Sequence, residues 1–275
     1  MKKKNLLYKI ATVPHIVWMV LFIVAPLLFV VYYSFTDTVG NPTFASILSL
    51  ADHLGTFGLS VSLAVIATAI CLVVGYPMAY WIAKTSPKNQ KILITLVMLP
   101  MWMNLLIRTY SMMAILDDGG FLNSFIELLG GSRLHIVGTS GAVVFGMVYN
   151  FLPYMVLPIY SVISKLDPSL VEASSDLGCS GMQTVFRVVI PLSISGIISG
   201  VTMVFVPSIS TFYISQKLGG GTFDLIGDTI ERQFQNPSTY NVGAAISLVM
   251  MILILISLAI MNKYSGDTEE GGIIV

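Results

Sequence analysis

The segment Asp167–Pro191, DPSLVEASSDLGCSGMQTVFRVVIP, is a polar stretch set between two long apolar runs of the chain. Asp167 is a favoured N-cap residue, and Pro168 is favoured at the first helical position, where its missing N–H costs nothing. Gly178 suits the left-handed conformation that ends many helices. The segment therefore predicts a polar helix of about ten residues that ends in a sharp turn.

The same segment predicts a second helix and gives the first one two unlike faces. Ser180 and Gln183 have the spacing of a capping box, which begins a helix that continues into the apolar run. At 100° per residue, the first helix has an apolar face and an acidic face. The apolar face holds Leu170, Ala173, Ser174 and Leu177, and the opposite face holds Ser169, Glu172 and Asp176. An interfacial helix on anionic lipid would carry Lys and Arg instead, so we expect a protein groove as its partner.

The composition places the whole chain in a membrane. Of its 275 residues, 55% are hydrophobic and 10% are charged, whereas an ordinary soluble domain has about 25% charged residues. The mean hydropathy is +0.85. These values exclude a disordered chain and a basic nucleic-acid-binding protein, and they argue against a soluble enzyme.

Six apolar runs are long enough to cross a bilayer, which takes about 20 residues of helix. They do not alternate as the strands of a membrane barrel do. The first run is too long for a signal peptide and has no small-residue cleavage site, so we expect an uncleaved span. The sequence predicts an all-α integral membrane protein with six transmembrane helices in a single domain, residues 1–275. The spans are about Pro14–Phe35, Gly58–Ala83, Ile92–Leu116, Gly138–Ile163, Val188–Ile214 and Val242–Met261.

The distribution of basic residues predicts the orientation, because Lys and Arg gather in cytoplasmic loops. With the amino terminus inside, most of them fall on the inner side: Lys2, Lys3, Lys4, Lys9, Lys84, Lys88, Lys91, Lys165, Arg187 and Lys263. Arg133, Lys217 and Arg232 fall outside. An even number of spans then puts both termini in the cytoplasm.

The predicted outer loops are net acidic. They hold Asp37, Asp52, Asp117, Asp118, Glu127, Asp224, Asp228 and Glu231. An acidic outer face suits a cationic substrate, but it also follows from the export of Lys and Arg to the other side. Both explanations stay open at this point.

The polar segment resembles a known motif. Glu172-Ala173-Ser174, then Gly178, then Val188-x-Ile190-Pro191, have the spacing of the EAA-x3-G-x9-I-x-L-P loop of ABC importer permeases. Ser174, Val188 and Ile190 are mild departures from it. The resemblance implies the type I ABC importer permease architecture, with 167–187 as a cytoplasmic coupling segment that docks on an ATPase. The residues it assigns to coupling are Asp167, Pro168, Leu170, Glu172, Ala173, Asp176, Leu177 and Gly178.

Shorter matches along the chain are similar to the polyamine subgroup of these permeases. They include Arg108-Thr109-Tyr110, Gly120-x-x-Asn123, Leu152-Pro153-Tyr154-Met155-x-Leu157-Pro158, Gly219-Gly220-Gly221, Ile226-Gly227, Gln233-Phe234 and Gly243-Ala244-Ala245. The resemblance implies a subunit for import of spermidine/putrescine-like polyamines across the bacterial inner membrane. Its implied partners are a second homologous permease, two cytoplasmic ATPase subunits that hold ATP and Mg, a periplasmic substrate-binding protein and membrane lipid.

The chain carries no recognisable catalytic or cofactor motif. It has no phosphate-binding P-loop, no zinc-protease motif and no nucleophile elbow. His15, His53 and His135 are far apart, and Cys71 and Cys179 are expected to be free thiols. We expect no catalytic residue, no metal, no cofactor and no nucleic acid on this chain, so energy must come from partners or from a gradient.

A polyamine needs carboxylates for charge and aromatic rings for cation–π contact along its path. The candidate pathway residues are Trp102, Arg108, Tyr110, Asp117, Asp118, Tyr149, Tyr154 and Glu231. Arg108 either reaches the outer interface or pairs with an acid, and the sequence leaves both open. Gly196-x3-Gly200 is expected to seat a neighbouring helix. The loop from Asp117 to Val137 is expected to contain a short interfacial helix.

Two alternatives remain. The same class of permease could carry another organic cation, an iron chelate or a phosphonate. A stand-alone secondary transporter is disfavoured, because it predicts charged residues at mid-span and repeated halves, and the spans hold little charge besides Arg108.

Overall fold

The computed structural model describes residues 13–270. Within them, the regular structure is helical apart from one isolated bridge between Thr36 and Pro42. This confirms the all-α prediction. Lys2, Lys3, Lys4 and Lys9, on which part of the predicted orientation rests, lie outside the described residues.

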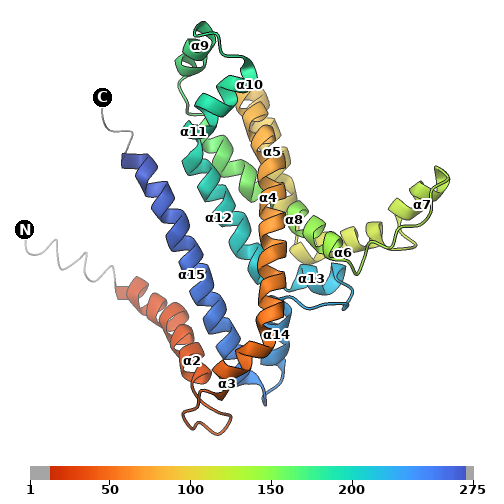
Figure 1. The fold of residues 1–275 in the computed structure, drawn as a ribbon, viewed down its shortest axis with the longest axis vertical. Helices are drawn as coiled ribbons and strands as arrows, with labels where there is room; N and C mark the ends of the chain where they lie inside the picture. The colour runs from red at the N-terminus through yellow and green to blue at the C-terminus, as the bar shows by residue number, and fades with distance from the viewer. Residues whose placement is uncertain (1–12, 271–275) are drawn as a thin grey trace, which may run out of the picture. The chain divides into compact units, whose positions relative to one another are not determined.

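The helices follow one another with short connections (Figure 1). In chain order they are η1 (Val20–Val24), α2 (Ala25–Ser34), α3 (Ala45–Leu48), η2 (Ser49–His53), α4 (Leu54–Lys84), α5 (Pro87–Trp102), α6 (Leu105–Leu116), α7 (Phe121–Leu128), α8 (Ser140–Ile163), α9 (Pro168–Asp176), α10 (Gly181–Thr184), η3 (Val185–Val189), α11 (Ile190–Leu192), α12 (Ile194–Ser210), α13 (Tyr213–Leu218), α14 (Ile226–Gln235) and α15 (Tyr240–Glu270).

Four helical stretches in the described part are long and apolar enough to cross a membrane uninterrupted. They are Val13–Ser34, Ala45–Lys84, Ser140–Ile163 and Tyr240–Met261. Two further pairs of helices pass the same test only together, Pro87–Trp102 with Leu105–Leu128 and Gly181–Leu192 with Ile194–Ser210. The total is six if each bent pair is one span, which agrees with the predicted number.

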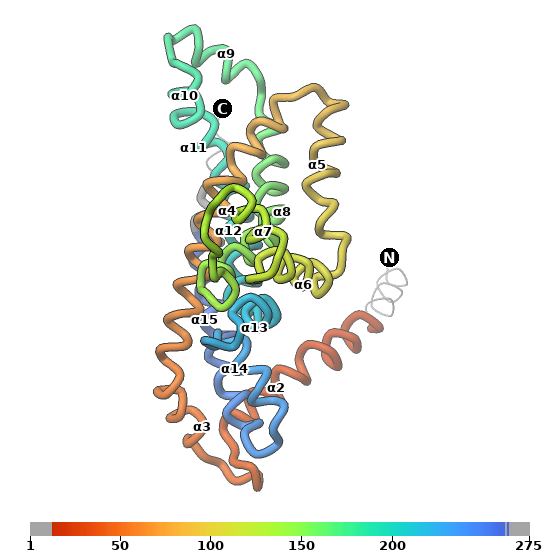
Figure 2. The backbone as a smooth tube through the Cα atoms, turned by 90° about the vertical axis from the view of Figure 1, so that its right-hand side faces the viewer, coloured from red at the N-terminus to blue at the C-terminus, as the bar shows by residue number. Residues whose placement is uncertain are grey.

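The predicted third span, Ile92–Leu116, is not one continuous helix. The chain bends by 92° between its two halves, and Figure 2 shows this turn at the end of α5. Pro100 lies inside the last turn of α5, and Met103 then adopts an extended conformation. Asn104 begins α6 as its N-cap, because its side chain accepts a hydrogen bond from the Leu106 N–H at 2.8 Å.

The predicted fifth span, Val188–Ile214, is also interrupted. Its two halves meet at Ser193 with a bend of 72°. Pro191 lacks the N–H that an uninterrupted helix needs, and the π-helical turn η3 precedes it. A second break follows α12 at Thr211, before the short helix α13.

The structure divides into two compact units. One contains the described part of 1–55 together with 229–253, and the other contains 56–228 with the described part of 254–275. In the first unit, the buried Asn241 side chain donates to the Tyr33 carbonyl at 3.0 Å and to the Thr36 carbonyl at 2.7 Å. This amide occupies carbonyls that the end of helix α2 leaves without a helical partner.

In the second unit, α8 is a central helix against which α12 packs (Figure 1). Met147, Met155 and Ile159 of α8 are fully buried. A Cβ on Gly196 would lie 2.9 Å from the Pro158 carbonyl oxygen, and one on Gly200 would lie 3.1 Å from that of Met155. The two helices therefore touch backbone to backbone, which confirms the predicted packing role of the Gly-x3-Gly pair.

We predict that Gly196→Ala destabilises the protein, because the added methyl group collides with backbone atoms of α8 that cannot rotate away. The cost of such overpacking is about 1–3 kcal/mol. The apparent melting temperature in mild detergent should fall. Gly58→Ala is the control, since nothing lies within 4 Å of a Cβ there, and equal melting temperatures for both variants would contradict the packing argument.

Candidate functional site

The predicted polar helix is α9, which begins and ends as its sequence indicates. The Asp167 side chain accepts the Ser169 N–H at 2.9 Å, and Pro168 occupies the first turn. Hydrogen bonds from Ser169 hold the pKa of the Asp167 carboxyl below its usual range, so this cap stays ionised at neutral pH. Gly178 has φ +81°, the left-handed conformation expected of it.

A compact turn joins α9 to α10 (Figure 1). The capping box is complete, with the Ser180 N–H donating to Gln183 Oε1 at 2.8 Å and the Gln183 N–H donating to Ser180 Oγ at 3.4 Å. The buried hydroxyl groups of Ser174 and Thr184 lie 2.9 Å apart. Side-chain hydrogen bonds therefore hold the two short helices together, so α9 is not a free loop.

The predicted apolar face of α9 is mostly exposed. Ser174 is 5% exposed and faces α10, but Leu170 is 43% exposed and Leu177 is 85% exposed. The leucines of the predicted face are thus open to a partner, whereas Ser174 of the same face is used within the chain by its contact with Thr184 of α10. Glu172 and Asp176 are exposed as well. This helix presents leucine side chains and carboxylates at the surface of the chain.

A hollow of about 350 Å³ lies beside the first turn of α9. Its lining comes from the last turns of α4, the end of α8 with the residues after it, the first turns of α9, and η3: Tyr80, Ala83, Lys84, Ile163, Ser164, Leu166, Pro168, Val171, Glu172 and Val189. The Lys84 ammonium lies 4.8 Å from the centre of the Tyr80 ring. Glu172 and Lys84 thus line the same hollow, between α9 and the helices that lead into the membrane-spanning part.

Two side-chain contacts connect this region to the long helices. Gln90 Nε2 donates to the Ala83 and Thr85 carbonyls at 2.9 Å each, and Gln90 Oε1 accepts the Tyr160 hydroxyl at 3.0 Å. Tyr76 of α4 and Ser193, at the bend before α12, are joined by a buried hydroxyl pair at 2.9 Å. These bonds tie α4, α5 and α8 to one another, and they tie α4 to the bend at Ser193.

The aromatic pathway candidates do not converge. Trp102 is 71% exposed beside the bend after α5. Tyr149 lines an apolar groove of about 400 Å³ together with Trp81 and Pro153. Tyr154 packs on the Phe151 ring at 6.3 Å between centres. No charged residue lines this groove, so it offers nothing to hold an ammonium ion by charge.

The Tyr110 ring is already covered by a cation of the chain itself. The Lys217 ammonium lies 5.1 Å from the centre of the Tyr110 ring and 5.8 Å from that of Tyr213. The two rings are 6.0 Å apart and nearly perpendicular. Sequence reasoning missed Lys217 and Tyr213, because no local pattern connects α13 with α6. The pair shows that an alkylammonium group fits between two rings of this protein.

Arg108 is buried, with 8% of its surface exposed. Its Nε and Nη1 groups are buried and donate to no partner within the described residues. Of the two alternatives given for Arg108, pairing with an acid is therefore not found within the described part of the chain.

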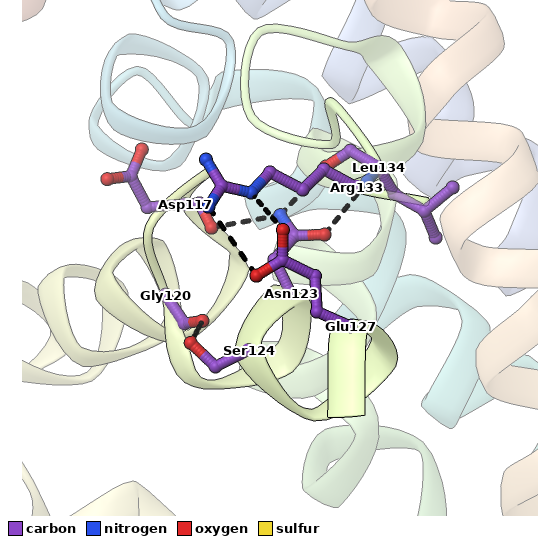
Figure 3. Close-up of polar contacts among 7 residues, drawn as sticks. All are labelled: Asp117, Gly120, Asn123, Ser124, Glu127, Arg133 and Leu134. Atoms are coloured by element: carbon purple, nitrogen blue, oxygen red, sulfur yellow. Dashed lines mark hydrogen bonds and ion pairs between the residues drawn. The ribbon is translucent and has the colours of Figure 1, made fainter. Parts of the chain in front are cut away.

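The loop after α6 folds into a hairpin that contains α7, as predicted (Figure 3). The buried Asn123 side chain donates to the carbonyls of Asp117 at 3.1 Å and Leu134 at 2.9 Å, and it accepts the Leu134 N–H at 2.8 Å. Glu127 and Arg133 form an exposed ion pair. One amide thus holds both ends of the hairpin together.

The acidic candidates of this hairpin lie at its surface. Asp118 contacts His135 Nδ1 at 3.0 Å, whereas the Asp117 carboxylate is exposed and points away from Asn123 (Figure 3). Glu231 belongs to the other compact unit, where it accepts a hydrogen bond from Gln235 at 2.7 Å. Of the eight pathway candidates, Tyr149 lines the apolar groove described above, and the others lie outside its lining. Among the described residues, no group of three His, Cys, Asp or Glu side chains is placed to hold a metal.

Comparison with known proteins identifies relatives over nearly the whole chain. Residues 75–266 match the family model described as "Binding-protein-dependent transport system inner membrane component". The chain is 38% identical to the spermidine/putrescine transport system permease protein PotB of Salmonella typhimurium (strain SL1344), over 98% of this chain and 100% of that protein. It is 31% identical to the inner membrane ABC transporter permease protein YdcU of Escherichia coli (strain K12), over 74% of this chain and 69% of that protein.

Solved structures share the fold. A chain of a bacterial ABC transporter involved in the import of the acidic polysaccharide alginate superposes with a TM-score of 0.76. The match has 18% identity and covers 97% of this chain and 96% of that one. A chain of the MetNI methionine ABC transporter matches with a TM-score of 0.57 and 15% identity, over 78% of this chain and 95% of that one. The architecture is therefore that of ABC importer permeases.

We predict that Gly178→Ala loosens α9, because a Cβ at φ +81° is strained although no neighbour blocks it. The penalty for a left-handed non-glycine residue is about 1–2 kcal/mol. Hydrogen–deuterium exchange of the amides in 168–178 should become faster. Gly181→Ala is the control, since it has an ordinary φ and equally open surroundings, and unchanged exchange in Gly178→Ala would refute the strained-turn argument.

Proposed function

Because the chain belongs to the family of binding-protein-dependent transport system inner membrane components, we propose that it imports spermidine/putrescine-like polyamines. It forms their path across the bacterial inner membrane together with a second, homologous permease. The chain itself is a permease subunit and not an enzyme. ATP and Mg²⁺ are bound and hydrolysed by two cytoplasmic partner subunits, and a periplasmic protein delivers the substrate.

The sequence identity to the PotB relatives is the observation that supports polyamines as the substrate. It holds at 38% over 98% of this chain, so it includes the loops as well as the spans. The Lys217 ammonium between the Tyr110 and Tyr213 rings supports it physically, since this protein accommodates an alkylammonium group on aromatic faces. Weak contacts of this kind suit a path that a substrate must leave.

The exposed surface of α9 supports docking on an ATPase subunit. Leu170 and Leu177 lie two helical turns apart on one side and are exposed, with Glu172 and Asp176 beside them. Anionic lipid headgroups would repel these carboxylates, whereas a protein groove with basic residues at its rim would attract them. The docked face is then on the cytoplasmic side, with both termini of the chain.

The bonds around α9 supply a route for the movement. An ATPase that shifts α9 pulls on α10 through Ser174 and Thr184 and then reaches the bend at Ser193. Tyr76 passes the displacement to α4, and Gln90 with Tyr160 passes it between α5 and α8. Helices that move together in this way open the path alternately to the two sides of the membrane.

We predict that Leu177→Asp weakens the association with the ATPase subunit. Burial of a leucine is worth about 1.5–3 kcal/mol, so the dissociation constant should rise roughly 10- to 100-fold. ATP-driven uptake should fall with it. Leu128→Asp is the matched control, because Leu128 of α7 is 81% exposed but lies outside the coupling segment. If Leu177→Asp binds the ATPase subunit as tightly as the original chain, α9 is not part of the interface.

The proposal as a whole is tested by purifying the tagged chain from its own membranes and reconstituting what comes with it. We expect an ATPase, a second permease and a periplasmic protein by mass spectrometry. The proteoliposomes should take up labelled spermidine or putrescine in an ATP-dependent manner. Uptake of a phosphonate or an iron chelate instead would correct the cargo, and gradient-driven uptake by this chain alone would overturn the class.

A further inference from the structure

Three aromatic rings cluster in the compact unit formed by 13–55 and 229–253. The centre of the Tyr240 ring lies 5.1 Å from that of Tyr33 and 4.8 Å from that of Phe234, with interplanar angles of 76° and 70°. Tyr33 is in the last turn of α2, Phe234 is near the end of α14, and Tyr240 begins α15. We refer to Tyr33, Phe234 and Tyr240 as the ring cluster.

Backbone contacts position these rings independently of one another. Asn241, the neighbour of Tyr240, binds the Tyr33 and Thr36 carbonyls and so fixes α15 against the end of α2. The Thr239 hydroxyl donates to the Gln233 carbonyl at 3.2 Å, which closes the turn between α14 and α15. The ring cluster is therefore preorganised, and a ligand would meet rings that are already in place.

Two hollows share the ring cluster as part of their lining. The first, of about 410 Å³, is lined by Pro26, Phe29, Val30, Tyr33, Phe234, Tyr240 and Ala244. The second, of about 590 Å³, is lined by Tyr32, Tyr33, Thr36, Asp37, Thr38, Val39, Gly40, Phe234, Pro237, Tyr240 and Asn241. We call them the apolar hollow and the acidic hollow. All three rings of the cluster line both.

Asp37 is the charged residue in the lining of these two hollows, and no Lys or Arg balances it there. Its Oδ1 accepts the Val39 and Asn41 N–H groups at 2.9 and 2.8 Å, and its Oδ2 accepts the Asn41 side-chain amide at 3.2 Å. A carboxylate has about four acceptor positions, so one remains for a further donor. Bonds from Asn41 keep the pKa of Asp37 below its usual range, and the group stays anionic at neutral pH.

The two hollows match the two parts of an alkylammonium ion. An ammonium group is stabilised by a carboxylate and by aromatic faces, and a methylene chain is stabilised by apolar surface. The C-terminal end of α2 adds partial negative charge at the same place. In the other compact unit, Lys217 already occupies the rings of Tyr110 and Tyr213. The described lining of the acidic hollow contains rings and a carboxylate but no such internal cation.

We propose that Asp37 and the ring cluster form a binding site for a primary alkylammonium group, with the ammonium in the acidic hollow and the carbon chain extending over the rings into the apolar hollow. The identification of the natural ligand as a free polyamine rests on the proposed function. The site itself rests on the rings, the carboxylate and the two hollows.

The test uses the complete transporter complex in nanodiscs of phosphatidylcholine and phosphatidylglycerol, which contain no primary amine. Binding of labelled spermidine is measured without ATP and without the periplasmic protein. Tyr240→Leu should weaken binding by about 2- to 30-fold, and Tyr240→Phe should retain it, since the ring supplies the contact. Asp37→Asn keeps an oxygen acceptor for the loop but should weaken binding by up to about fivefold.

Two matched variants in the same unit serve as controls. Phe44→Leu removes an exposed ring that packs on Phe35 and lines neither hollow, and Asp52→Asn removes an exposed carboxylate that lines neither hollow. Both should bind spermidine as the original chain does. Equal binding by Tyr240→Leu and Phe44→Leu, in complexes that elute identically on size exclusion, overturns the proposal.

Two further arms separate the site from the cargo and from lipid. Titration with n-butylammonium tests the site without any polyamine, so ring-dependent binding of this ion supports it even if spermidine is not transported. If the complex takes up spermidine with ATP but Tyr240→Leu does not change spermidine binding, the proposed function stands and the proposed site is overturned. Nanodiscs that contain phosphatidylethanolamine complete the test, because loss of spermidine binding there would assign the site to a lipid headgroup and overturn the polyamine proposal.

Discussion

A backbone inside a bilayer has no water to satisfy its N–H and C=O groups, and several helix ends in the described part of this protein are held by polar side chains. Asn104 caps the helix that follows the 92° bend. The Tyr76 hydroxyl meets Ser193 at the 72° bend. The Asn241 amide binds the carbonyls at the end of α2. At the first bend the Asn104 side chain takes up a backbone N–H, and at the second the hydroxyl pair fixes Ser193 against α4.

Helix caps also order the polar segment around α9, although this segment lies outside the apolar spans. Asp167, Gly178 and the capping box satisfy both ends of two short helices, and the Ser174–Thr184 contact joins them. The leucines and carboxylates of α9 are left exposed because the internal bonds use other side chains. If α9 docks on an ATPase subunit as proposed, these local bonds let it pass a force to the spans without deforming first.

Sequence reasoning predicted the caps of α9, the glycine contact of α12 and the number of spans because each depends on residues that are neighbours along the chain or repeat at helical spacing. It did not predict the bends, since Pro100 and Pro191 are compatible with a kinked but continuous helix. It also missed the Lys217–Tyr110 contact and the ring cluster. Tyr33 and Tyr240 come from opposite ends of the sequence, and only the folded chain brings them together.

The close contact of Gly196 and Gly200 with α8 holds α8 and α12 together as one packed pair. Two helices whose backbones touch cannot slide past each other without a collision, so in the proposed transport cycle we expect α8 and α12 to move together. Helix α12 has 17 residues, a length of about 25 Å at 1.5 Å per residue. A rotation of about 10° at one end moves the other end by roughly 4 Å over such a length. In the proposed cycle, the two glycines thus help a small rotation at one end of α12 to become a larger displacement at its other end.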